Sequence, residues 1–245
     1  MFKNDSNDIA TCNKAIDSIK NASNFTKWSI SIIDKYIGNN ILEIGAGIGT
    51  FTDFFLQKET VIATEIDDYC FAELLKKYDN NYKIKVINGD ILDDSFVETV
   101  KQVNPDINTV ICFNVLEHIE DDSKAIGNIK KCIKKDGYII LRVPAFNLLY
   151  SNLDRNVGHF RRYSKKDISE KILLNGLEIV ELSYMDMVGF MAWFFLFKIF
   201  KKESFASENQ IGIYDKFVPL FSKIEKLIKY PFGLTLFAVC KKKEI

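Results

Sequence analysis

An apolar run that breaks into alternating glycines constrains this chain more than any other stretch. It reads "ILEIGAGIGT" over residues 41–50, and its glycines are Gly45, Gly47 and Gly49. A buried strand that leads into a glycine turn is typical of sites where a nucleotide lies against bare backbone. The stretch therefore predicts an α/β nucleotide-binding fold, and it leaves open which nucleotide is bound.

Short apolar runs alternate with helical patterns through the middle of the chain. We predict strands at residues 41–44, 61–66, 84–87, 109–113 and 138–143. We predict helices between them, near residues 51–57, 69–78, 95–103 and 123–134. Such alternation with short connections indicates a parallel sheet that is covered by helices on both faces.

The pattern changes beyond residue 143. Ser164 can cap a helix with Asp167 at the capping-box position, and Gly176 follows the end of that helix. Two further strands are expected at residues 178–184 and 235–240, separated by an aromatic-rich helical insertion of about fifty residues. We therefore predict a doubly wound, seven-stranded, mostly parallel sheet.

We predict one domain over residues 1–245. It comprises a helical segment (1–40), a core (41–184), the insertion (185–233), and a last strand with a basic tail (234–245).

Composition narrows the class of partner and the compartment. Thirty-three basic residues balance thirty-three acidic ones, so no global field would draw the chain onto nucleic acid. The five cysteines lack metal-type spacing and fit buried positions in a reducing cytoplasm. The N-terminus lacks the apolar core of a signal peptide, and the apolar stretch 187–200 is too short to span a bilayer.

Two common nucleotide motifs do not fit the glycine turn. Thr50 stands where the dinucleotide fingerprint has its third glycine, and no Gly-Lys-Ser/Thr follows the turn. Glu65 ends the second strand, where a carboxylate can hold ribose hydroxyls. Asp90 follows the third strand, where it can accept hydrogen bonds from an adenine amino group. These features indicate an adenosine-containing ligand.

Four motifs in order along the chain carry a family resemblance. The glycine turn, Glu65, the "GD" of Gly89 and Asp90, and "FNVLEHI" after the fourth strand together resemble class I S-adenosylmethionine-dependent methyltransferases. The resemblance implies a sheet with an antiparallel last strand, S-adenosyl-L-methionine as cofactor and S-adenosyl-L-homocysteine as product. More narrowly, "GHFRRYS" and "PFGLTLFAVCKK" resemble bacterial methyltransferases of cell-surface polysaccharide and glycolipid pathways.

The same resemblance implies a set of cofactor-binding residues. They are Glu43, Gly45, Ala46, Gly47, Gly49, Glu65, Ile66, Asp90, Ile91 and Asn114. The glycines would let the backbone approach the cofactor, Glu43 would order its aminoacyl end, and Glu65 would take the ribose. Asp90 and Ile91 would frame the adenine, and Asn114 would face the sulfonium.

The chain has two histidines, His118 and His159, and both are expected near the carboxyl edge of the sheet. Because histidine titrates near neutrality, we place both as candidate general bases, with a structural role as the alternative for each. A metal site made with Glu117 is a further hypothesis. We predict that no metal is used, since Asn114 stands where an acid would be expected.

The segment "DRNVGHFRRYSKK" gathers cations in an otherwise neutral chain. We predict that Arg161 or Arg162 contacts an acidic group of the methyl acceptor, with Trp193 as a wall and Tyr163 either as a wall or as part of the core. The alternative is a solvated loop in which one arginine bridges to the core. The insertion has three interpretations: a helical pair folded onto the sheet, an apolar lid, or shallow attachment to a membrane leaflet through its basic amphipathic helix.

The functional hypothesis is methyl transfer to an oxygen or nitrogen atom of a small-molecule, glycan or lipid-linked acceptor, in the cytoplasm or at the inner membrane face. One competing hypothesis is nucleic-acid methylation, because "ILEIGAGIGTFT" resembles ribosomal-RNA adenine dimethylases. Their proline-containing motif after the fourth strand is replaced here by "CFNVLEH". An NAD-dependent oxidoreductase and a non-catalytic cofactor-binding partner also compete with methyl transfer as hypotheses.

Overall fold

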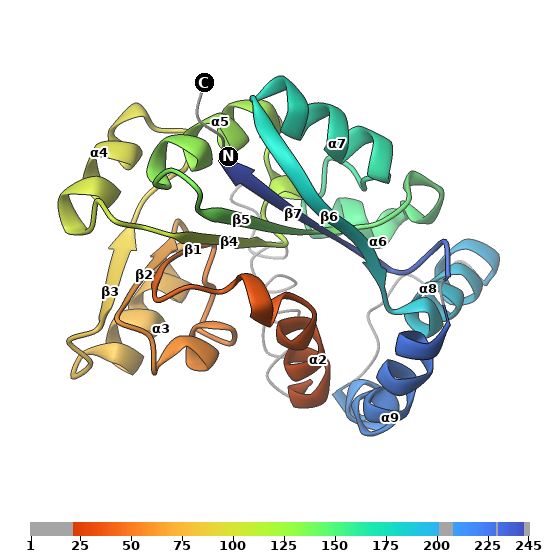
Figure 1. Ribbon diagram of the computed structural model, residues 1–245. Helices are drawn as coiled ribbons and strands as arrows, with labels where there is room; N and C mark the ends of the chain where they lie inside the picture. Colours follow the sequence, from red (N-terminus) through yellow and green to blue (C-terminus); the bar gives the residue numbers. More distant parts are fainter. Residues whose placement is uncertain (1–21, 201–207, 229, 243–245) are drawn as a thin grey trace.

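A seven-stranded sheet forms the centre of the molecule (Figure 1). The computed structural model describes residues 22–200, 208–228 and 230–242. The strands are β1 (Asn40–Ile44), β2 (Thr60–Glu65), β3 (Ile84–Asn88), β4 (Thr109–Phe113), β5 (Tyr138–Pro144), β6 (Leu177–Met185) and β7 (Thr235–Lys242). Their order across the sheet is β3-β2-β1-β4-β5-β7-β6.

One strand, β7, runs opposite to the other six. The pairs from β3 to β5 are all parallel, whereas β7 is antiparallel to both β5 and β6. The seven strands and the reversed last strand confirm the predicted fold class. The central strands are short apolar runs because helices cover them on both faces; every residue of β4, for example, is buried.

Helices pack on both faces of the sheet and create two apolar cores. One core lies under α4 (Asp94–Val103), α5 (Asp122–Cys132) and α7 (Lys165–Leu174). The other lies under α2 (Ser23–Ile33), α3 (Asp68–Tyr78) and part of α9 (Glu208–Leu227). Figure 1 shows the two groups on opposite sides of the strands. The predicted Ser164–Asp167 capping box begins α7, as expected.

The order of the strands also determines where a ligand can bind. The chain proceeds from β1 outward to β3, then returns to β4 on the other side of β1. The carboxyl ends of β1 and β4 therefore flank a topological switch point, where the following connections diverge and leave a crevice. The glycine turn follows β1 and Asn114 follows β4, so both predicted motifs lie at this crevice.

Short helical turns complete the connections. They are η1 (Asp34–Tyr36), η2 (Thr52–Phe55), η3 (Leu116–His118), η4 (Asn147–Leu149) and α6 (Asn152–Asn156). The helix predicted near residues 51–57 is only the four-residue 3-10 turn η2. Its threonine and phenylalanines lose rotamer freedom in an α-helix, which explains why this segment does not continue.

Buried thiols agree with the sequence interpretation. Cys70, Cys112, Cys132 and Cys240 are all free and buried. Cys12 lies outside the described residues, as does most of the helical segment predicted over residues 1–40.

The insertion between β6 and β7 is helical, as predicted. It contains α8 (Met187–Trp193), the π-helical turn η5 (Phe194–Ile199) and α9. In Figure 1 these elements extend to one side of the sheet, next to α2. None of the helices in the described ranges combines the length and the apolar content needed to cross a bilayer.

A buried carboxylate fastens the insertion to α2. Asp215 of α9 accepts hydrogen bonds from the backbone N–H of Asn24 (3.0 Å) and of Phe25 (2.8 Å). The residue before α2, Ala22, has no side chain that could cap the helix. Asp215 thus supplies, from 190 residues away, the cap that the local sequence lacks.

We expect Asp215→Ala to lower the free energy of unfolding by about 1–2 kcal/mol, because it leaves two partly buried N–H groups at the start of α2 without their cap. Urea unfolding followed by circular dichroism would measure the change. Lys216→Ala removes the exposed neighbouring side chain and is the matched control, expected to stay within about 0.5 kcal/mol of wild type. Equal effects of the two substitutions would contradict the capping role.

A second buried acid fastens the glycine turn to the sheet. Glu43 of β1 is 3 % exposed, and its carboxyl oxygen accepts a hydrogen bond of 2.7 Å from the Thr52 hydroxyl beyond the turn. Burial raises the pKa of Glu43 to about 8, against the opposing effect of this hydrogen bond. The side chain is therefore largely protonated at neutral pH.

The raised pKa of Glu43 predicts a loss of stability with rising pH. The unfolded chain releases this proton near its ordinary pKa of 4.5, whereas the folded chain holds it up to about pH 8. The free energy of unfolding therefore falls across this interval. Glu43→Gln stays neutral throughout, so between about pH 5 and about pH 9 it should gain several kcal/mol relative to wild type, on the order of 3–4. If urea unfolding gave wild type and Glu43→Gln the same dependence of unfolding free energy on pH, the raised pKa of Glu43 would be refuted.

Candidate active site

The glycine turn leaves an open space at the switch point. Gly45 and Gly47 have positive φ angles of 69° and 58°, which side-chain-bearing residues rarely adopt. A Cβ at Gly45 would collide with Val115, whereas a Cβ at Gly47 would meet nothing within 4 Å. Gly45 is therefore required by packing. Gly47 presents bare backbone to empty space, as a cofactor cradle requires.

Glu65 holds this turn in place. Its carboxylate accepts hydrogen bonds from the N–H groups of Gly47 (2.8 Å), Ile66 (2.8 Å) and Asp67 (3.0 Å). A carboxylate has about four acceptor positions, so one remains for a ribose hydroxyl. The predicted ribose contact stays a prediction, but the structure adds a second role: Glu65 joins the ends of β1 and β2.

The predicted adenine residues lie along the same edge of the sheet. Asp90 follows β3, is half-buried, and accepts a hydrogen bond of 2.8 Å from the Leu92 N–H. Ile91 is 5 % exposed, and Ile66, after β2, is 50 % exposed. Ile66 can thus meet a ligand directly, whereas Ile91 mostly supports the loop.

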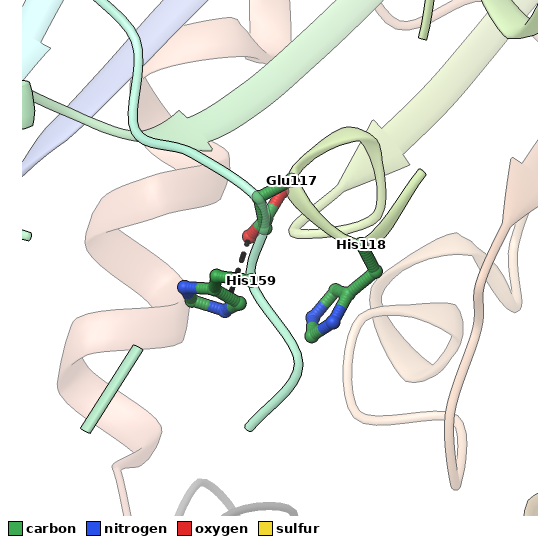
Figure 2. A group of neighbouring side chains, drawn as sticks. All are labelled: Glu117, His118 and His159. Carbon is green, nitrogen blue, oxygen red and sulfur yellow. Dashed lines mark ion pairs between the residues drawn. The ribbon is translucent and has the colours of Figure 1, made fainter. Parts of the chain in front are cut away.

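A second group of polar side chains lies beyond β4. Figure 2 shows Glu117 and the imidazoles of His118 and His159 gathered in one cluster, with Glu117 paired to His159. Asn114, at the end of β4, donates a hydrogen bond of 2.9 Å to Glu117 Oε1. Asn114 also has a positive φ of 54°, a strained conformation for a residue with a side chain. With this backbone conformation, the Asn114 amide at the edge of the sheet points toward Glu117.

His159 is held in a defined orientation by a buried aspartate. Its Nδ1 lies 3.0 Å from Asp154 Oδ1, and its Nε2 lies 4.0 Å from Glu117 Oε1. Burial alone would raise the pKa of Asp154, but the His159 hydrogen bond and the Arg162 charge outweigh it and lower that pKa. An ionised Asp154 favours the tautomer with the proton on Nδ1, which leaves Nε2 as a proton acceptor.

His118 lies beside His159 but has a different electrostatic environment. The two rings are 4.6 Å apart in an edge-to-face arrangement. Burial lowers the pKa of His118, and the neighbouring Glu117 only partly opposes this effect. His118 is therefore neutral at physiological pH. The structure brings the two predicted histidines together, as their shared place at the carboxyl edge implies.

The same cluster has the donor set of a divalent-cation site. Glu117, His118 and His159 each offer one ligand atom, and these atoms lie within 4.8 Å of one another. His159 also uses its other ring nitrogen on a carboxylate, an arrangement common behind metal ligands as well as behind general bases. Metal-free catalysis therefore stays a prediction, and a chelator distinguishes the two possibilities.

Two predicted acceptor-binding residues are instead part of the interior. Arg162 is 3 % exposed; its Nε pairs with Asp154 at 2.8 Å, and its guanidinium stacks on Trp193. Tyr163 is fully buried, and its hydroxyl donates to Asp122 at 2.7 Å. An isolated β-bridge between Ala145 and Tyr163 directs this side chain inward. Tyr163 therefore takes the core position that the sequence left open, and the acceptor contact of Arg162 stays a prediction.

The remaining members of the predicted acceptor site keep partial access to solvent. The Arg161 side chain is 27 % exposed and pairs with Asp122 at 2.8 Å. Trp193 is half-buried and donates its indole N–H to the Leu149 carbonyl at 3.1 Å. Their contact with an acceptor stays a prediction.

Sequence reasoning overlooked Asp154. It lies five residues before His159, inside the segment noted for its arginines, and it completes a capping box with Ser151. The short distance in sequence between Asp154 and His159 was the only indication that the two side chains could meet. Its importance appears only in three dimensions, where it contacts both His159 and Arg162.

Comparison with known proteins identifies the family and the fold. A family model described as "Methyltransferase domain" matches residues 34–182, more than half of the chain. A methyltransferase structure from Bacillus halodurans has a TM-score of 0.58 at 14% identity, with 88% of this chain and 98% of that one covered. The N-methyltransferase NodS of Bradyrhizobium japonicum, solved with S-adenosyl-L-homocysteine, has a TM-score of 0.55 at 16% identity, covering 89% and 85%.

Sequence relatives match a shorter part of the chain. Ribosomal RNA small subunit methyltransferase A of Streptococcus mutans is 38% identical over 92 residues, 36% of this chain and 30% of that protein. The Gloeobacter violaceus protein of the same name is 29% identical over 106 residues, 43% and 37%. The matches thus span about a third of these relatives. The chain therefore belongs to the methyltransferase domain family, and its fold is that of class I S-adenosylmethionine-dependent methyltransferases.

Proposed function

We propose that this enzyme transfers the methyl group to an oxygen or nitrogen atom of a small-molecule, glycan or lipid-linked acceptor, with His159 as the general base. The cofactor supplies an electrophilic methyl group on a sulfonium, so the protein must align a nucleophile and remove its proton. The observation that carries the proposal is the Asp154–His159 pair, placed next to Asn114 at the end of β4.

The geometry suits proton removal from a hydroxyl or an amine. Asp154 fixes the proton on His159 Nδ1, and Nε2 then faces the space shared with Glu117 and His118. When His159 takes a proton, the buried carboxylates of Asp154 and Glu117 stabilise the resulting imidazolium from both sides. His118, neutral through burial, remains a second candidate base.

We expect His159→Gln to lower methyl transfer by roughly 10²–10⁴-fold while the affinity for S-adenosyl-L-homocysteine stays within about twofold. Transfer of label from radioactive S-adenosylmethionine to a bacterial glycolipid extract, and calorimetry with the product, measure the two quantities. Parallel losses of both would indicate a structural role. Treatment with EDTA should leave wild-type turnover unchanged, and loss of turnover would assign the cluster to a metal.

The nature of the acceptor is suggested by the surface of the insertion. Large apolar side chains are exposed along α9 at helical spacing: Ile213 (57 %), Phe217 (52 %), Leu220 (54 %), Ile224 (39 %) and Leu227 (87 %). Exposed side chains of α8 and η5 add to them: Met191, Phe195, Leu196 and Ile199. We name this set the insertion face. Apolar patches of this kind are rare on monomers without a partner.

The charges around the insertion face favour an anionic membrane as that partner. Lys216, Lys223 and Lys226 of α9 are exposed, whereas the acids Asp215 and Glu225 of the same helix are buried. An amphipathic helix with lysines beside an apolar stripe is suited to shallow insertion among acidic lipid headgroups. This surface supports a lipid-linked acceptor and a cytoplasmic enzyme that works at the inner membrane face.

We expect the protein to float with vesicles that contain phosphatidylglycerol and to bind less to pure phosphatidylcholine vesicles. Phe217→Ser combined with Leu220→Ser should abolish flotation. The matched control, Leu173→Ser with Leu174→Ser, changes two leucines that are as exposed (59 % and 83 %) but lie on α7. The membrane proposal fails if wild-type protein does not float, or if light scattering shows that a second copy covers the insertion face.

A second candidate function is ribosomal-RNA methylation, favoured by the relatives named above. Their identity to this chain is confined to about a third of their length, and this chain has "CFNVLEH" after β4 and no net charge. Supplying 30S ribosomal subunits in the same labelling assay separates the candidates. Label in RNA and none in lipid would replace the first proposal with the second. Product binding without transfer to either would favour a non-catalytic partner.

A further inference from the structure

Arg142 places a charge in the interior of the sheet. It lies on β5, opposite Phe113 of β4 and Phe237 of β7, and is only 7 % exposed. Burial lowers its pKa to about 10, so the guanidinium is still charged at neutral pH. A buried cation is costly to a fold unless it is paired or hydrogen-bonded.

Arg142 lacks such a partner among the described residues. Its Nε and Nη1 are buried and have no hydrogen-bond partner there. Glu117 and Asp186 act on it only through their longer-range charge. Glu43, which lies on the same face of the sheet, is itself protonated near neutral pH. Among the described residues the guanidinium therefore keeps unused N–H donors, and no carboxylate forms an ion pair with it.

Three aromatic rings surround this charge. The Arg142 Cζ atom lies 5.6 Å from the ring of Phe25, 5.1 Å from that of Phe51 and 5.5 Å from that of Phe113. We call these three rings and the guanidinium the Arg142 box. The rings hold the cation by cation–π contact, but they accept no conventional hydrogen bond from its N–H groups. The Arg142 box is thus preorganised for an anion that can accept one.

Two walls of the Arg142 box adjoin, in the sequence, the segments predicted to bind the cofactor. Phe51 follows the glycine turn directly, and Phe113 immediately precedes Asn114. The Asn114 N–H donates to the Arg142 carbonyl at 2.8 Å, which joins β5 to the end of β4. Phe25 comes from α2, which covers this side of the sheet.

The order of the strands indicates which anion would arrive there. Asp90 follows β3, Glu65 ends β2, and the glycine turn follows β1. Across the sheet, β4 and then β5 come next. A cofactor with its adenine near β3 and its ribose near β2 extends its amino-acid end over β1 toward β4 and β5. We infer that Arg142 binds the α-carboxylate of the methionine-derived end of the cofactor. This assignment rests on the cofactor identified above.

Calorimetry on the whole chain tests the inference with two ligands. One is S-adenosyl-L-homocysteine, and the other is its decarboxylated analogue, which keeps the adenosyl group, the sulfur and the amine. Wild-type protein should bind the first at least tenfold more tightly. Arg142→Met should abolish this preference by weakening only the first. Gly47→Val, in the cradle itself, should weaken both ligands alike.

The outcomes separate this inference from the identity of the enzyme. Equal binding of both ligands by wild-type protein, or an unchanged preference in Arg142→Met, overturns the role of Arg142 and leaves the methyltransferase assignment intact. Failure of wild-type protein to bind either ligand overturns both. If Arg142→Met does not fold, Arg142→Lys, which keeps the positive charge, replaces it. A reduced but remaining preference for S-adenosyl-L-homocysteine over the decarboxylated analogue then supports the inference. An undiminished preference contradicts a requirement for the guanidinium.

Discussion

The site depends on one carboxylate that holds a turn of bare backbone. Glu65 accepts hydrogen bonds from the Gly47 N–H in the glycine turn and from the N–H groups of Ile66 and Asp67, which follow β2. These bonds connect the end of β1 to the end of β2. Glu43 secures the far side of the turn through Thr52. Both anchors are hydrogen bonds within the protein, so the chain itself holds the turn in the conformation that exposes the Gly47 backbone.

Charge is distributed unevenly across the crevice. The β2 and β3 side carries acids that suit ribose and adenine, whereas the β5 side carries the buried cation of Arg142. Between them, Asn114 connects the sheet edge to Glu117 and the Asp154–His159 pair. This arrangement orients an asymmetric ligand along the sheet and leaves the proton-accepting groups next to the position expected for its reactive centre.

The strands can be predicted from sequence because buried parallel strands are short apolar runs. Their order across the sheet then indicates that the ligand binds at the carboxyl ends of the strands. The helix predicted at η2 is wrong because periodicity does not register the rotamer cost of threonine and phenylalanine. The burial of Arg162 and Tyr163 could not be predicted, because a cation-rich segment does not reveal which side chains face inward. Asp154 and Arg142 escape sequence reasoning because their roles arise from contacts between distant segments.

Asp215 joins two surfaces that have separate tasks. It holds the first turn of α2 from within α9, and Phe25 in that turn forms one wall around Arg142. The opposite side of α9 carries the insertion face. Any displacement of α9 therefore shifts the first turn of α2 and the ring that covers the guanidinium. If a partner on α9 and a ligand in the crevice each favour one position of that helix, thermodynamic reciprocity requires that each change the affinity of the other by the same factor.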